Sequence, residues 1–82
     1  FSTMLTLNIV SPEKIIYSGT AEKVVVPGTM GQFEILDNHA PLISSLDEGE
    51  IRYTTVDGEY SCVIERGFVE VKKNNVDICV EV

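Results

Sequence analysis

The sequence has few basic side chains, and this scarcity excludes several classes of partner. Six Lys and Arg residues stand against thirteen Asp and Glu residues, which gives a formal net charge of -7. Affinity for nucleic acid depends on clustered cations that release counterions from the phosphate backbone. Only Lys72 and Lys73 are adjacent in the chain. We therefore exclude a nucleic-acid role, and the same charge disfavours binding to an anionic membrane surface.

Long apolar runs and abundant cysteine are also missing. No uninterrupted apolar run approaches the roughly 20 residues that span a bilayer, so we expect no direct insertion into a membrane. No charged-then-apolar leader of the secretory kind opens the chain. Cys62 and Cys79 lack metal-binding or redox spacing and fall in strand-like stretches, which predicts two reduced, partly buried thiols. Reduced thiols fit a cytosolic location.

The length predicts one small domain that covers residues 1–82. A hydrophobic share of 44% suits a packed globule rather than a disordered tail. Because the chain starts with Phe1, we interpret Met4 as the natural start and residues 1–3 as a remnant joined to it.

The hydrophobic period is two almost throughout, and no long stretch has apolar residues at helical spacing. Leu5, Leu7 and Ile9, for example, alternate with polar residues. Similar runs, rich in β-branched and aromatic residues, follow along the chain at 15–17, 22–26, 32–36, 42–46, 51–56, 59–64, 68–71 and 76–82. Many short antiparallel strands in a small chain predict an all-β fold, either a β-sandwich or a flattened barrel.

Turn residues separate these runs. Asp57-Gly58 stands between two strand-like segments and is the strongest hairpin signal in the chain. Further reversals are predicted at Asp47-Glu48-Gly49, at Arg66-Gly67 and at Lys73-Asn74-Asn75. Asp37-Asn38 predicts another turn, after which the chain leaves in an extended conformation because Ala40 precedes a proline.

The segment from Gly28 to Leu42 is the most informative part of the sequence. Two glycines, Gly28 and Gly31, predict a tight turn, and a half-buried strand follows it. The segment resembles the Gly-x-x-Gly…His-Ala-Pro-Leu stretch of the epsilon subunit of F-type ATP synthases. Further similar pieces occur in the same order: Ser11-Pro12-Glu13, Tyr17-Ser18-Gly19, Glu22-Lys23-Val24, Gly49-Glu50-Ile51-Arg52 and Gly67-Phe68-Val69-Glu70-Val71.

This resemblance implies a sandwich of about ten strands in two sheets and a non-catalytic role in the rotor. Such a subunit clamps the foot of the gamma subunit and sits on the c-ring, at the cytoplasmic side of the bacterial inner membrane. It acts only indirectly on the alpha/beta catalytic head, and it needs no cofactor. Members of the family commonly carry a C-terminal helical hairpin. This sequence stops at Val82, where we expect the sandwich to close, so we expect no such hairpin here, whether the short form is natural or cut.

By family likeness, two groups of residues are candidate contacts. Ser11, His39 and Ser44 match positions near the gamma-facing side. The c-ring loop is matched by Thr29, Met30, Gly31 and Gln32. Gln32 is neutral where some relatives carry an acidic residue, which weakens the case for a salt bridge to a basic ring loop.

His39 is the only histidine, and its possible roles can also be considered from the residues around it alone. A catalytic base needs a nucleophile and an orienting partner, and a metal site needs further ligands; neither pattern surrounds His39. A turn histidine that makes local hydrogen bonds remains an alternative to the interface role. Similarly, the Gly28–Gly31 turn lacks the lysine and the following helix of a phosphate-binding loop, so it is either a plain β-turn or a contact loop.

Three function classes therefore remain. The first is the rotor-stalk subunit. The second is a generic β-sandwich adaptor that binds a peptide along a sheet edge, which a long, uncharged edge strand would favour. The third, an enzyme with His39 as base, requires a deep pocket that converges on that residue.

Overall fold

The computed structural model describes residues 4–37 and 39–82, so the remnant predicted at residues 1–3 and the Asn38 half of the predicted Asp37-Asn38 turn lie outside it. The described chain forms nine strands and no helix, and hence no helix long enough to cross a membrane. The strands are β1 (Leu5–Val10), β2 (Ile15–Ala21), β3 (Lys23–Gly28), β4 (Gly31–Leu36), β5 (Leu42–Leu46), β6 (Gly49–Thr55), β7 (Gly58–Ile64), β8 (Arg66–Lys72) and β9 (Asn75–Glu81). The all-β prediction is confirmed.

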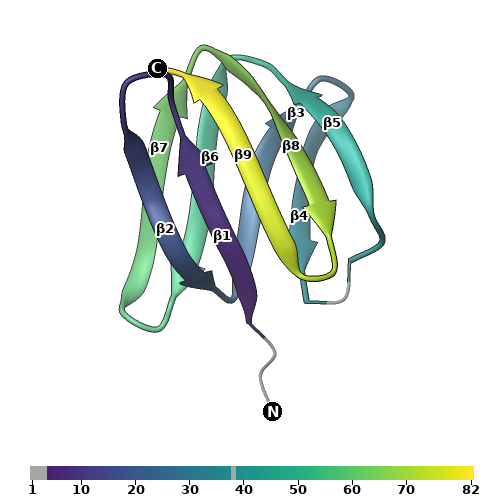
Figure 1. Cartoon of the computed structure of the whole chain (residues 1–82). Coiled ribbons are helices and arrows are strands. Elements are labelled where there is room, and N and C mark those ends of the chain that lie inside the picture. Colours follow the sequence, from purple (N-terminus) through teal and green to yellow (C-terminus); the bar gives the residue numbers. More distant parts are fainter. Residues whose placement is uncertain (1–3, 38) are drawn as a thin grey trace.

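The strands form two layers that are joined along one side (Figure 1). One layer has the order β2-β1-β9-β8-β5, and the other has the order β4-β3-β6-β7. A single residue pair, Gly28 with Leu46, connects β3 to β5 and makes one curled sheet of the two layers. Neighbouring strands are antiparallel except β1 and β9, which run parallel. The parallel pair is the one departure from the predicted antiparallel arrangement.

Alternating side chains fill the space between the layers. The fully buried side chains include Leu5, Leu7 and Ile9 of β1. Each of the eight remaining strands also contributes at least one buried residue to the core. In the run of three valines in β3, Val24 and Val26 point inward while Val25 is only partly buried. Three equal residues in a row carry no alternation, so the sequence alone could not assign these faces. Close packing of such a core resists deformation.

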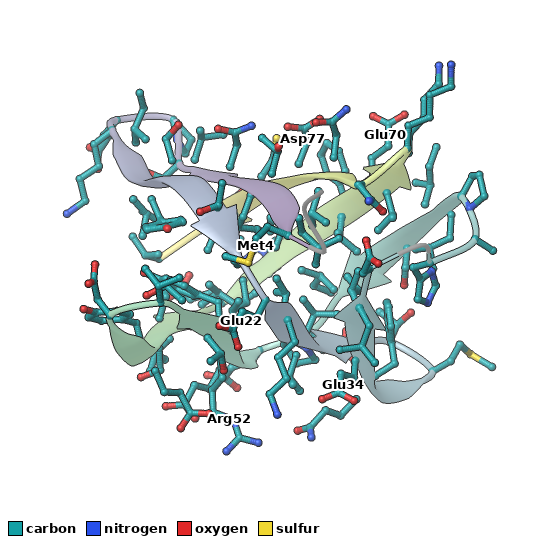
Figure 2. The ribbon with its side chains drawn as sticks, turned by 90° about the horizontal axis from the view of Figure 1, so that it is seen from below. Met4, Glu22, Glu34, Arg52, Glu70 and Asp77 are labelled. Atoms are coloured by element: carbon teal, nitrogen blue, oxygen red, sulfur yellow. The ribbon has the colours of Figure 1, made fainter. Side chains whose placement is uncertain are left out.

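The outer faces of both layers carry many charged side chains, and Ile43, Val63 and Phe68 are exposed there beside them. Figure 2 shows Glu34 and Arg52 pointing away from the β4-β3-β6-β7 layer, and Glu70 and Asp77 pointing away from the other layer. Glu34 forms an exposed ion pair with Lys23, with 3.5 Å between the Nζ and Oε2 atoms. These charges keep the two faces solvated while the core stays apolar.

The predicted hairpins form, with one shift in position. Lys73 and Asn74 both have positive φ angles, 50° and 63°, as the tight turn between β8 and β9 requires. The β6–β7 hairpin turns at Val56-Asp57, and Gly58, with φ of +134°, begins β7 instead of ending the turn. The hairpin is confirmed, one residue earlier than the Asp57-Gly58 signal.

The reversal predicted at Arg66-Gly67 occurs just before it, at Glu65, where the chain leaves β7 and returns in the opposite direction along β8 in the other layer (Figure 1). Arg66 and Gly67 both lie within β8, where Gly67 pairs with Val80 of β9 and Leu46 of β5. A Cβ atom on Gly67 would lie 2.4 Å from the carbonyl oxygen of Cys79. The glycine is there because two backbones approach closely, and not because the chain turns.

Candidate interaction surface

The turn between β3 and β4 presents an exposed apolar side chain on a well-supported base. Thr29 and Met30 form a two-residue turn between the paired residues Gly28 and Gly31. Gly31 has a φ of +123°, a conformation open to glycine but strained for other residues. Met30 is 98% exposed. A methionine side chain this exposed is adaptable and gains from being covered.

Two backbone hydrogen bonds tie this turn and the end of β3 to β5 and to the residue that follows it. Thr29 N donates to the carbonyl oxygen of Ser45 at 3.1 Å, and Asp47 N donates to that of Pro27 at 2.9 Å. Gly28 pairs with Leu46 between these two bonds. The turn is therefore anchored to both layers at the point where they join.

A largely apolar groove of about 610 Å³ lies next to this turn. It runs over the ends of β5, β8 and β9, and Thr29 and Ser11 both contribute to its lining. Val10, Pro12, Phe68 and Cys79 supply apolar surface along it. None of these four residues was predicted from the sequence as a contact residue. Period-two alternation does place Phe68 and Cys79 on the outward face. It does not show that β8 and β9, the strands that carry them, lie next to the Ser11 and Thr29 turns.

Ser11 lies in the turn between β1 and β2, at the same end of the molecule as Met30 (Figure 1). Its side chain closes the turn locally: Lys14 N donates to Ser11 Oγ at 3.3 Å, and Ser11 N donates to Lys14 O at 2.9 Å. The structure thus brings together Ser11 and Thr29, which were predicted as contacts for different partners.

His39 lies at the opposite end, in the connection between β4 and β5. Its backbone N donates to Leu36 O at 3.2 Å, and its ring Nδ1 lies 2.8 Å from Ala40 O, a contact in which the Nδ1–H group donates. His39 does not line the groove beside the Thr29-Met30 turn. It also does not line a second apolar groove, which residues 41–43 and 70–73 form between β5 and β8. These contacts are those of a locally hydrogen-bonded turn histidine.

Ser44 lies midway along β5 and is partly buried. Its hydroxyl donates to the carbonyl oxygen of the next residue, Ser45, at 3.1 Å. The three residues predicted to face gamma are therefore not clustered: Ser11 and His39 lie at opposite ends of the sandwich, and Ser44 lies between them on the strand that runs from one end to the other.

The titratable groups show no arrangement suited to catalysis in the part of the chain that the structure describes. No group of three or more His, Cys, Asp or Glu side chains there could hold a metal ion. Burial raises the pKa of the Cys62 thiol, and the Lys14 charge opposes this shift, so the thiol stays protonated at neutral pH. Burial also raises the pKa of Tyr53, and the neighbouring Cys62, Tyr17 and Tyr60 add to the rise. Neither group is an activated nucleophile.

Comparisons with known proteins converge on one family. Residues 4–82 match the family profile described as ATP synthase, Delta/Epsilon chain, beta-sandwich domain. The chain is 42% identical over 78 residues to the ATP synthase epsilon chain of Leptospira borgpetersenii, with 95% of this chain and 61% of the relative covered. It is 49% identical over 73 residues to that of Desulfitobacterium hafniense, with 89% and 55% covered.

Solved structures share the fold at low sequence identity. A chain of the mitochondrial ATP synthase of Euglena gracilis matches with a TM-score of 0.89 at 19% identity, over 98% of this chain and 52% of that one. A chain from the central stalk and c-ring of the Tetrahymena thermophila enzyme matches with a TM-score of 0.79 at 16% identity, over 95% and 63%. This chain thus spans somewhat more than half the length of the relatives that it matches.

Proposed function

This chain belongs to the family of ATP synthase delta and epsilon chains, whose β-sandwich domain it matches, and from that premise we propose that it is a non-catalytic subunit of the central stalk. In this role it joins the membrane c-ring to the gamma subunit and turns with both. Rotation of the ring during proton-driven ATP synthesis then reaches the alpha/beta catalytic head through gamma. The subunit works at the cytoplasmic face of the bacterial plasma membrane and requires no cofactor.

The single observation that carries the proposal is the anchored Thr29-Met30 turn. A contact that transmits twist must not yield under load. Backbone hydrogen bonds hold this turn at the join of the two layers, while Met30 projects fully into solvent. We propose that Thr29, Met30, Gly31 and Gln32 contact the ring. Met30 supplies adaptable apolar contact, and the uncharged Gln32 supplies hydrogen bonds rather than a salt bridge.

The proposed gamma contacts are Ser11, Ser44 and His39. Because Ser11 lies in the β1–β2 turn, His39 lies at the opposite end and Ser44 lies on β5, a partner that touches all three must reach across the β2-β1-β9-β8-β5 layer. Such a long contact resists rotation of one body against the other better than a contact at one point. The tightly packed core behind β5 supports it.

Substitution at the turn tests the ring contact. Met30→Asp or Gln32→Asp places a charge at the proposed interface. Desolvating an unpaired carboxylate there should cost more than about 1.4 kcal/mol of binding free energy, which corresponds to a tenfold loss of affinity. We expect at least roughly tenfold less of the variant to co-purify with the ring from membranes. Val56→Asp is the matched control, since Val56 is an exposed residue of a two-residue turn at the other end. Equal recovery of Met30→Asp and Val56→Asp would show that the Thr29-Met30 turn is not part of the ring contact. Failure to recover gamma in a pull-down with this chain would contradict the stalk role itself.

A further inference from the structure

Strand β7 offers an open edge on the side of the molecule away from β5. It ends the strand order of its layer, and β6 is the only strand that pairs with it among residues 4–37 and 39–82. The pairing with β6 is regular over all seven residues, without a bulge. The free side of β7 is thus a straight row of backbone donors and acceptors.

The direction of these backbone groups follows from a neighbouring hydrogen bond. The carbonyl oxygen of Thr54 accepts from Glu22 N at 2.7 Å, so the backbone of Thr54 faces β3 and not β7. Its pair mate on β7, Glu59, consequently points its own N–H and C=O groups away from β6. By alternation, Ser61 and Val63 do the same. Three residues therefore present unpaired groups along one edge.

This edge lacks the devices with which proteins usually protect one. Between Gly58 and Ile64 there is no proline, and Glu59 is the only charged residue. Apolar side chains are also exposed here: Val63 is 69% exposed and Tyr60 is 47% exposed. A long, nearly neutral edge of this kind invites pairing with another chain, and a protein that retains it gains most when a partner covers it.

The side chains around the edge define the chemistry of that partner. An added strand would direct alternate residues toward the inner row of β7, where Tyr60 packs on Tyr53 with ring centroids 5.8 Å apart and Cys62 packs against the core. The ring of Tyr17 of β2 lies tilted against the same Tyr53, with ring centroids 4.7 Å apart, so β2 of the other layer also borders this side (Figure 1). Apolar or aromatic residues fit there. The intervening residues would lie beside Glu59, Ser61 and Val63. The charge of Glu59, on a chain of net charge -7, favours lysine or arginine at the position beside it.

We propose that the free edge of β7 binds an extended segment of a partner protein as an added strand, with apolar residues alternating with basic ones. This site goes beyond the stalk role, since it lies on the side opposite β5 and away from the Thr29-Met30 turn. A second copy of this chain is a poorer occupant, because two chains of net charge -7 repel each other.

The test uses a blocked eight-residue peptide of alternating lysine and valine, and the same peptide with every backbone amide N-methylated as a control for charge. We expect saturable binding of the first peptide alone, with slowed amide hydrogen exchange at Glu59, Ser61 and Val63. Ser61→Pro removes an outward donor but leaves the β6 pairing intact, so binding should weaken by about tenfold or more.

A charge swap keeps the test decisive if Ser61→Pro fails to fold. Glu59→Lys should weaken peptide binding several-fold, while Glu70→Lys, which changes the net charge equally on the other layer, should not. Equal binding of the methylated peptide, equal loss with both lysine variants, or dimerisation of the chain with protection of the same three amides would overturn the proposal. None of these results would bear on ring or gamma association, which is measured separately.

Discussion

The two exposed hairpin turns, Thr29-Met30 and Val56-Asp57, look alike in sequence and differ in how the rest of the molecule supports them. Each has two residues, each is followed by a glycine with a positive φ angle, and each exposes an apolar side chain. The first is held at the join of the layers, because Thr29 N donates to Ser45 O of β5 and Asp47 N donates to Pro27 O of β3. The second is bonded within its own hairpin, where Asp57 N donates to Thr55 Oγ1 at 3.1 Å.

This difference shows what makes a turn suitable for a mechanical contact. The Thr29-Met30 turn stands where the two layers join, so a force on it is distributed to both layers. The Val56-Asp57 turn stands at the end of a hairpin whose other strand, β7, is an edge. A local sequence signal specifies either turn, but only long-range packing decides which one is stiff.

The largest loss of stability is expected from a substitution that disrupts the hydrophobic core between the two turns. Val24→Asp buries a carboxylate in the core, where Val24 has no exposed surface, and a small domain with roughly 3–5 kcal/mol of stability should unfold. Val25→Asp is the matched control on the outer face, beside Arg52 in the pairing, and should remain folded. Thermal unfolding followed by circular dichroism distinguishes them. A folded Val24→Asp variant would mean that the assignment of inward faces is incorrect.

The next largest effect is expected from two glycine substitutions, which separate the cost of backbone strain from the loss of contact with the ring. Gly31→Ala and Gly58→Ala both force a left-handed backbone on alanine with no side-chain clash, so each should cost about 1–3 kcal/mol in the free energy of unfolding. Denaturant titration should give similar losses for the two variants. Only Gly31→Ala should also reduce association with the ring. If both variants impair association equally, general instability explains the loss and the comparison between the turns fails.

The smallest effect concerns the support inside the second turn. Thr55 is largely buried, and its hydroxyl donates to Gly58 O at 3.3 Å while accepting from Asp57 N. Thr55→Val keeps the shape but leaves these groups without their partner, which should cost about 1 kcal/mol in stability. Association with the ring should not change. A large drop in ring recovery would show that the Val56-Asp57 end takes part in the contact.

The sequence predicted the local parts of this fold well. The turns at Lys73-Asn74 and near Asp57 were found because their conformations depend on a few neighbouring residues. Gly67 was misread because a glycine needed for close backbone approach looks the same in sequence as a turn glycine. The parallel pairing of β1 with β9 joins residues about seventy positions apart, and no local pattern indicates it.

The candidate site was predictable only in part, for the same reason. The exposed Met30 turn follows from two glycines and a polar neighbourhood. The apolar groove does not, since it needs the ends of three strands and the Ser11 turn to meet. Family likeness selected Ser11, His39 and Ser44 one by one, but their separation across the β2-β1-β9-β8-β5 layer becomes visible only in three dimensions.

Hydrogen exchange in the assembled rotor tests the central claim most directly. The amides of residues 29–32 and those of residues 55–58 are compared between the free chain and the chain bound to gamma and the ring. We predict that exchange slows at residues 29–32 on assembly and stays unchanged at residues 55–58. Equal slowing of the two turns, or slowing at residues 55–58 alone, would contradict the account.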